Sequence, residues 1–144
     1  MDAGDRFPEF RLPCAGSGSF DGAGLSGLRR VVFFCPPGGE PALAEAFGAL
    51  RPRFMMRNVP VIGVSGESPR RLAELIGDRP PGIVMLSDGD GSLARGAGAW
   101  EGGGIAEATF IVGRDGLVEA AWRGAQGPGH AERVLERAIS LSKR

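Results

Sequence analysis

The chain has 144 residues, a length that suits one globular domain and allows a core of its own. Its 17 basic and 17 acidic residues balance, so no net field favours nucleic acid or an anionic membrane surface as a partner. No stretch has the length of a membrane span or the basic and apolar parts of a signal peptide, and we expect a cytoplasmic protein.

The first part of the chain predicts a β-hairpin followed by a strand and a helix. A short edge strand is expected over 7–12, a turn-rich segment that closes the hairpin over 14–24, and a buried strand over 31–35. From Pro41 on, apolar residues recur at helical spacing, and proline suits the first turn of a helix. Pro52 is expected to end or kink that helix because it cannot donate a backbone hydrogen bond.

The rest of the chain alternates strands and helices. Ser68 is a capping residue for a helix that begins at Pro69. Further strands are expected over 59–65, 83–87, 109–112 and 117–122, the last two as a hairpin, and further helices over 92–99 and 130–141. This order predicts an α/β fold, a three-layer sandwich with a central mixed β-sheet flanked by helices, as a single domain over 1–144.

The two cysteines, Cys14 and Cys35, form neither a disulfide framework nor a zinc pattern. A disulfide between them stays open, because it requires Cα atoms within about 7 Å. His130, the one histidine, falls at the start of the last expected helix, where a structural role suffices. We therefore expect no metal site and no cofactor.

The segment from Val31 to Phe47 is the part of the chain best suited to hold reactive side chains. Its apolar strand stops at Pro36, Pro37 and two glycines, and a helix follows. A strand that feeds a helix through a tight turn presents unpaired N–H groups and positive potential at the helix N-terminus. This turn is the first place to look for a functional site.

Seven short segments of the chain form a set with a characteristic order and spacing. They are 4–13, 31–36, 61–65, 86–91, 98–100, 108–112 and 129–135. Together they resemble peroxiredoxins of the bacterioferritin-comigratory (Q-type) branch. The resemblance covers nearly the whole chain and implies a thioredoxin-like fold, with an N-terminal β-hairpin, and a thiol-redox ancestry.

The active-site signature of that family is Pro-x-x-x-Thr-x-x-Cys, in which the Cys thiolate attacks the peroxide from the first turn of a helix. Pro36 matches the Pro, whereas Glu40 stands at the Thr position and Leu43 at the Cys position. Glu107 stands where an Arg precedes the Thr-Phe of a later strand, and Phe47 lies where many members have a second thiol. Because a leucine side chain cannot attack an O–O bond, peroxidase activity is expected to be absent or weak.

Three side chains at or near the turn are candidates for a chemistry other than that of the family signature. Cys35 follows the central strand but lies off the helix N-terminus, so it is either a relocated reactive thiol or a small buried one. If the family geometry holds, Glu40 and Glu107 point into one small pocket, where two carboxylates push one pKa upward and make a general acid or base. The alternative is that Glu40 is a solvated carboxylate at the helix start and Glu107 a loop residue.

The remaining candidates for the pocket are Pro36, Leu43, Phe47, Trp100 and Thr109. Three functions stay open: a family member that has lost its peroxidase, a repurposed enzyme or accessory protein of one pathway, and a non-catalytic binding module. The expected partners are a small-molecule ligand or substrate and a second copy of the chain in a homodimer. Packing in the core or at an interface is expected for Trp100 and Trp122.

Overall fold

The computed structural model describes residues 1–77 and 83–143. Its centre is a sheet of five strands in the order β5-β4-β3-β8-β9. The strands are β3 (Arg30–Phe34), β4 (Val61–Ser65), β5 (Val84–Ser87), β8 (Ala108–Val112) and β9 (Val118–Arg123). β3, β4 and β5 run parallel, while β8 and β9 are antiparallel to their neighbours. The expected mixed sheet is therefore confirmed.

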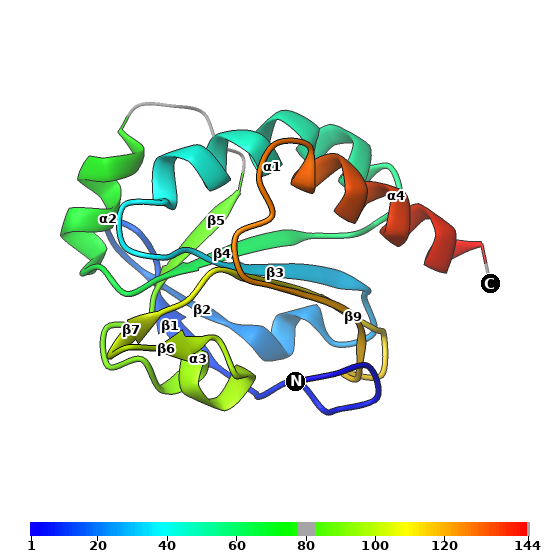
Figure 1. The fold of residues 1–144 in the computed structure, drawn as a ribbon, viewed down its shortest axis with the longest axis horizontal. Helices are drawn as coiled ribbons and strands as arrows, with labels where there is room; N and C mark the ends of the chain where they lie inside the picture. Colours follow the sequence, from blue (N-terminus) through cyan, green and yellow to red (C-terminus); the bar gives the residue numbers. More distant parts are fainter. Residues whose placement is uncertain (78–82, 144) are drawn as a thin grey trace.

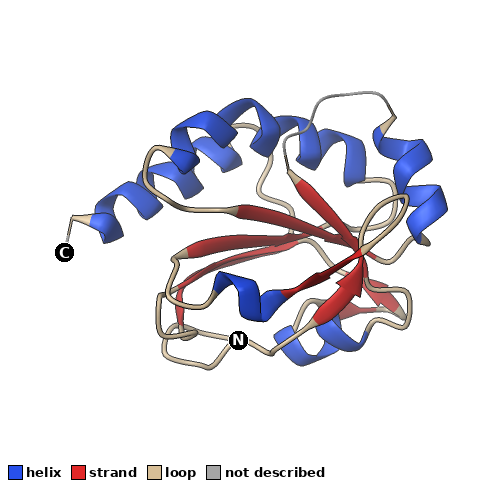
Figure 2. Cartoon of the chain, turned by 180° about the vertical axis from the view of Figure 1, so that it is seen from behind, coloured by secondary structure: helices blue, strands red, loops and turns tan. Residues whose placement is uncertain are grey.

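The sheet lies between two layers (Figures 1 and 2). One face is covered by three helices, which are α1 (Glu40–Met55), α2 (Pro69–Ile76) and α4 (His130–Ser142). The other face is covered by short elements, which are β1 (Arg11–Pro13), β2 (Ser19–Asp21), the 3-10 helix η1 (Gly22–Leu25), α3 (Ser92–Ala97), β6 (Trp100–Glu101) and β7 (Gly104–Ile105). The three-layer sandwich and the N-terminal hairpin, β1 with β2, are both confirmed.

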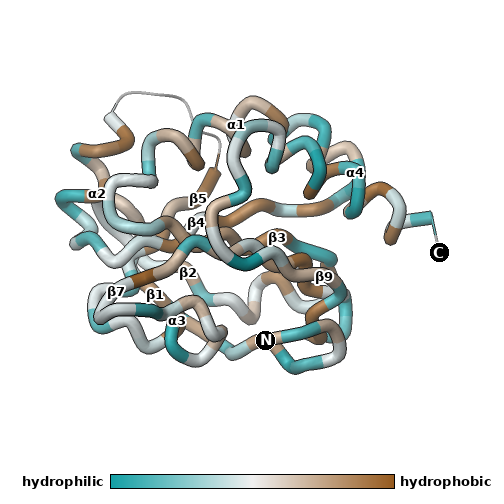
Figure 3. The backbone as a smooth tube through the Cα atoms, in the orientation of Figure 1, coloured by the Kyte–Doolittle hydropathy of each residue, from teal (hydrophilic) through white to brown (hydrophobic). Residues whose placement is uncertain are grey.

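The central strand β3 supplies both cores because successive side chains point to opposite faces. Val31 and Phe33 pack under α1 and α4, where the rings of Phe33 and Phe47 stack with centroids 4.5 Å apart. Val32 and Phe34 pack on the opposite face. Figure 3 shows hydrophobic residues along the central strands and hydrophilic ones on the outer turns of the helices. Burial on both faces explains the uninterrupted apolar run of this strand.

Pro52 does not end α1, so the first of the two expected effects of this proline, a helix end, is wrong. The helix continues to Met55, and the carbonyl oxygen of Pro52 accepts a hydrogen bond from the Met56 N–H. A proline this close to the C-terminus costs one backbone bond, while Phe54, which is fully buried, holds the last turn in the core. Burial of the aromatic ring outweighs the missing donor.

Two of the other boundary differences have a clear structural cause. The N-terminal strand begins at Arg11 rather than at residue 7, because Phe7 turns into the core, with its ring centroid 5.6 Å from that of Phe110. The helix expected over 92–99 stops at Ala97, since Gly98 adopts the left-handed conformation with φ 76°. No helix in the described part of the chain is long and apolar enough to cross a membrane.

Candidate functional site

The turn between β3 and α1 directs its side chains inward. The N–H of Gly39 donates to the carbonyl oxygen of Pro36 at 2.8 Å, and Gly38 has a φ of 83° that a residue with a side chain rarely adopts. The Pro36 ring packs so closely on Gly39 that a Cβ there would lie 3.0 Å from it. This tight turn brings Glu40, the first residue of α1, into the interior.

Glu40 is a buried carboxylate with only 1% of its surface exposed. Its Oε2 accepts a hydrogen bond from Ser65 Oγ at 2.7 Å, and that hydroxyl in turn accepts the Glu67 N–H at 3.0 Å. Its Oε1 is buried and has no hydrogen-bond partner among the described residues. The alternative of a solvated carboxylate at the helix start is therefore wrong.

Cys35 is a buried free thiol, 1% exposed, at the end of β3. Burial raises the pKa of this thiol well above 9.0, and the charges of Glu40 and Glu107 raise it further. Both effects disfavour the thiolate, which is the reactive form. Cys14 is also a free thiol, so the two cysteines are not paired in this structure.

Leu43 lies one turn into α1 and lines a cavity of about 370 Å³. Phe47, Glu107 and His130 line the same cavity. The backbone of Glu107 accepts the Gly124 N–H at 2.9 Å, and its Oε2 accepts the Gln126 N–H at 3.3 Å. Through these two hydrogen bonds Glu107 holds the segment after β9 close to the start of β8. No thiol lines this cavity.

Glu40 and Glu107 do not share one cavity. Glu40 lines a second, smaller cavity of about 220 Å³ together with Cys35 and Trp100, whereas Glu107 lines the larger one. The expectation of two carboxylates in one pocket is therefore not met. The charges of both side chains nevertheless raise the pKa of Cys35.

Thr109 and His130 form a buried hydrogen bond that the sequence did not reveal. Thr109 Oγ1 and His130 Nε2 lie 2.9 Å apart, and the imidazole makes edge contacts with the rings of Phe47 and Trp122. Burial lowers the pKa of His130, and the charge of Arg133 lowers it further. Thr109 therefore links β8 to α4 through a hydrogen bond. It lines neither of the two cavities.

Trp100 forms one wall of the smaller cavity. The guanidinium of Arg95 lies 4.3 Å from the centre of its ring system, and the indole packs so closely on Gly91 that a Cβ there would come within 2.2 Å. These contacts fix the ring in place. Among the described residues, no three His, Cys, Asp or Glu side chains gather in a group that could hold a metal ion.

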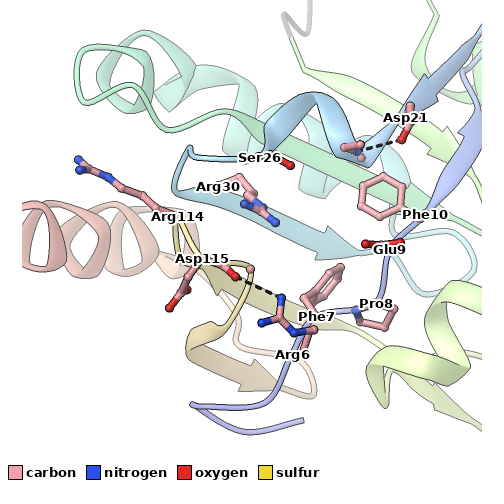
Figure 4. Close-up of a pocket in the computed structure, with 13 residues that line it drawn as sticks. Arg6, Phe7, Pro8, Glu9, Phe10, Asp21, Ser26, Arg30, Arg114 and Asp115 are labelled. Atoms are coloured by element: carbon pink, nitrogen blue, oxygen red, sulfur yellow. Dashed lines mark hydrogen bonds between the residues drawn. The ribbon is translucent and has the colours of Figure 1, made fainter.

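A third cavity, of about 230 Å³, lies at the opposite end of β3 and contains none of the expected site residues. Figure 4 shows Arg6 there, with Nη1 donating to the carbonyl oxygen of Asp115 at 3.2 Å. Nη1 of Arg30 donates to the carbonyl oxygens of Leu28 and Gly113. These hydrogen bonds hold the N-terminal segment and β3 against the β8–β9 turn. Arg6 and Arg30 therefore have a structural role.

The sheet order, the helix layers and the β3–α1 turn define a protein of the thioredoxin-like peroxiredoxin class. The chain belongs to the AhpC/TSA family, whose sequence profile matches residues 3–121. It is 27% identical over 147 residues to a putative peroxiredoxin bcp of Helicobacter pylori, which covers 94% of this chain and 97% of the relative.

Solved structures agree with this assignment. Peroxiredoxin Q of Xanthomonas campestris matches with a TM-score of 0.84 at 26% identity, over 98% of this chain and 99% of that one. Peroxidoxin BcpB of Mycobacterium tuberculosis matches with a TM-score of 0.89 at 23% identity, over 98% of both chains, a likeness of fold. The resemblance to Q-type peroxiredoxins is therefore confirmed.

Proposed function

We propose that this chain is a member of the peroxiredoxin family that does not reduce peroxides by the thiol chemistry of the family. The observation that carries the proposal is Leu43 in the first turn of α1, in a cavity that no thiol lines. The family signature places the attacking thiolate at this position, and an alkyl side chain has no lone pair with which to attack an O–O bond.

The second support is the state of the nearest thiol. Cys35 is fully buried at the end of β3, and its raised pKa keeps it protonated near neutral pH. Glu40 and Glu107 replace the hydroxyl and the cation that the signature uses to hold the peroxide oxygens. Two carboxylates at these places repel the negative charge that develops on the leaving oxygen.

The geometry favours a binding module over a repurposed acid–base enzyme. Paired catalysis by Glu40 and Glu107 requires both carboxylates at one substrate, and they line different cavities. Leu43, Phe47 and Glu107 instead line a cavity of about 370 Å³, which is large enough for a small ligand.

Peroxide consumption tests the loss of activity. We expect the protein to consume hydrogen peroxide and tert-butyl hydroperoxide, with dithiothreitol or thioredoxin as reductant, no faster than a Cys35→Ser variant. Cys14→Ser serves as the matched control for the other thiol. Turnover by the native chain that disappears in Cys35→Ser but persists in Cys14→Ser would show that Cys35 has taken over the peroxidatic role.

A further inference from the structure

The cavity at the opposite end of β3 from the β3–α1 turn brings two guanidinium groups together. Arg6 comes from the segment before β1 and Arg30 from the first position of β3, and both line this cavity of about 230 Å³. A Cβ at Gly116 would lie 3.1 Å from Arg6 Nη1 and 3.9 Å from Arg30 Nη2, so the two nitrogens flank one point. Figure 4 shows both side chains directed into the same space, whereas Arg114 points away from them. Two like charges this close repel each other unless an anion lies between them.

Neither guanidinium has a carboxylate as an ion-pair partner in the described part of the chain, where the ion pairs involve other arginines. The two aspartates that line the cavity bind backbone groups. Asp21 Oδ1 accepts the Ala23 N–H at 2.9 Å, and Asp115 Oδ1 accepts the Leu117 N–H at 3.1 Å. Burial lowers the pKa of Arg30, and the charge of Asp115 offsets this effect only in part. The positive charge of Arg30 is therefore incompletely compensated within the described structure.

The structural hydrogen bonds of the two arginines leave most of their donors free. Nη1 of Arg30 donates to three backbone carbonyl oxygens, and the hydrogen bond of Arg6 also uses Nη1. Nε and Nη2 of Arg30 have no partner among the described residues, and neither belongs to the fully buried atoms that lack one, so solvent reaches both. Arg6 is exposed. Donors of both residues are thus accessible from the cavity that they line.

The arrangement of these donors favours a compact anion with two charges. Guanidinium groups bind the oxygens of carboxylates and phosphates through paired N–H groups. A phosphoryl group carries about two negative charges near neutral pH and three acceptor oxygens, so it can serve both arginines at once. The cavity lies below the roughly 300 to 1,000 Å³ of pockets for drug-sized ligands. Glu9 also lines it, and this carboxylate confines an anion to the side of Arg6 and Arg30.

We propose that this cavity binds a phosphoryl dianion between Arg6 and Arg30, either as inorganic phosphate or as the head group of a small phosphate monoester. Free N–H groups of both arginines donate to the phosphoryl oxygens, and the two positive charges balance those of the ligand. The proposal goes beyond the loss of peroxidase activity and does not depend on it, because Pro36, Glu40 and Leu43 do not line this cavity.

Titration with inorganic phosphate, followed through the backbone amide signals of the ¹⁵N-labelled protein at constant pH and ionic strength, tests the proposal. We expect a saturable shift of the Gly116 signal and little change at Gly39, which lies in the β3–α1 turn. Chloride at equal ionic strength has neither the second charge nor the oxygens, so it should give no saturable shift. Glycerol 3-phosphate distinguishes the two sources. Tighter binding than that of inorganic phosphate assigns the site to a monoester, and weaker binding assigns it to the free ion.

Three variants locate the interaction. Arg6→Gln removes one of the two charges from an exposed side chain, and we expect phosphate affinity to fall about tenfold. Glu9→Gln removes a negative charge from the cavity wall and should raise the affinity. Arg51→Gln, which changes an exposed arginine of α1 that lines none of the three cavities, is the matched control and should bind like the native chain. None of these variants removes the hydrogen bonds of Arg30, so the test does not depend on a change at that residue.

Three results would overturn the proposal. They are the absence of a saturable Gly116 shift with both phosphate compounds, an equal shift with chloride, and unchanged phosphate affinity in Arg6→Gln. Weaker binding in Glu9→Gln also contradicts it, because a carboxylate can only repel the proposed ligand. Peroxide consumption is measured separately and bears only on the proposed loss of activity.

Discussion

At the scale of single residues, Glu40 departs from what its position in the helix predicts. The sequence places a carboxylate in the first turn of a helix, which ordinarily predicts an exposed residue stabilised by the helix dipole. Its burial depends on Ser65 at the end of β4, a neighbour 25 residues away that only the folded sheet brings near. No local sequence pattern predicts such a contact.

Glu40→Gln is expected to stabilise the protein. The variant keeps an oxygen that can accept the Ser65 hydroxyl and removes a buried charge that no cation balances in the described structure. We expect the free energy of unfolding to rise by about 1 kcal/mol or more, as is common when an uncompensated buried charge is removed. Urea unfolding measures the difference between this variant and Glu136→Gln, which removes an exposed carboxylate on α4 and should change by less than about 0.5 kcal/mol. A destabilised Glu40→Gln contradicts the expectation.

The two thiols are expected to differ in reactivity. Cys35 is buried with a raised pKa, whereas Cys14 is partly exposed. Iodoacetamide at neutral pH should therefore modify Cys14 first, and Cys35 only after unfolding, because alkylation needs both access and thiolate. Peptide mapping by mass spectrometry after short labelling times measures both sites, and equal labelling of the two in the folded protein contradicts the prediction.

The same pKa gives a pH dependence of stability. In the unfolded chain the Cys35 thiol loses its proton near 9.0, while in the folded protein it keeps the proton to higher pH. The unfolded state therefore binds fewer protons above that value, and the free energy of unfolding falls as the pH rises beyond about 9. Cys35→Ala should remove part of this fall, and Cys14→Ala should not.

At the scale of the elements, most of the fold follows from the sequence. Apolar runs buried on both faces identify β3 and β4, and Ser68 caps α2 as expected, with its Oγ accepting the Arg71 N–H. The β6–β7 hairpin was missed, because strands of two residues have no alternation that could be recognised. Pro52 misled the prediction because a local rule was applied where the burial of Phe54 decides.

The apolar face of α4 packs in the core, and the hydrogen bond of Thr109 with His130 adds a buried polar contact between β8 and α4. The pKa of His130 is lowered by burial and by Arg133, so the folded protein holds the imidazole neutral to lower pH than the unfolded chain does. The unfolded state therefore binds more protons below about 6.5, and the contribution of His130 to stability is lost as the pH falls from that value through the folded pKa.

Because the chain has a single histidine, this contribution can be isolated. We expect the free energy of unfolding of the native chain to fall faster between pH 6.5 and 5 than that of His130→Gln, which cannot titrate in this range. Thr109→Val keeps the histidine and removes the hydroxyl, so it should lower stability while retaining the pH dependence. Parallel pH curves for the native chain and His130→Gln are the result that contradicts this account.

At the scale of the whole molecule, the fold is that of the family, whereas the change in its signature residues belongs to the proposed function. The structure superimposes on Q-type peroxiredoxins with a TM-score of 0.84 for the X. campestris protein, and the Pro36 turn still begins the helix that holds Leu43. The proposed loss of peroxidase activity is compatible with this fold, since chemistry depends on a few side chains of a scaffold. A homodimer and a cytoplasmic location stay predictions.

Restoring the signature tests whether the frame alone can still position a nucleophile. The triple variant Glu40→Thr, Leu43→Cys, Glu107→Arg supplies a thiol in the first turn of α1, a hydroxyl and a cation, and we expect it to consume hydrogen peroxide with dithiothreitol as reductant. Leu43→Cys alone lacks the two groups that stabilise the leaving oxygen, so we expect it to be about a hundredfold slower. The pKa of the new thiol should lie below that of Cys35, because it stands at a helix N-terminus beside an arginine. A folded triple variant without activity contradicts the idea that the signature residues are all that the scaffold has lost.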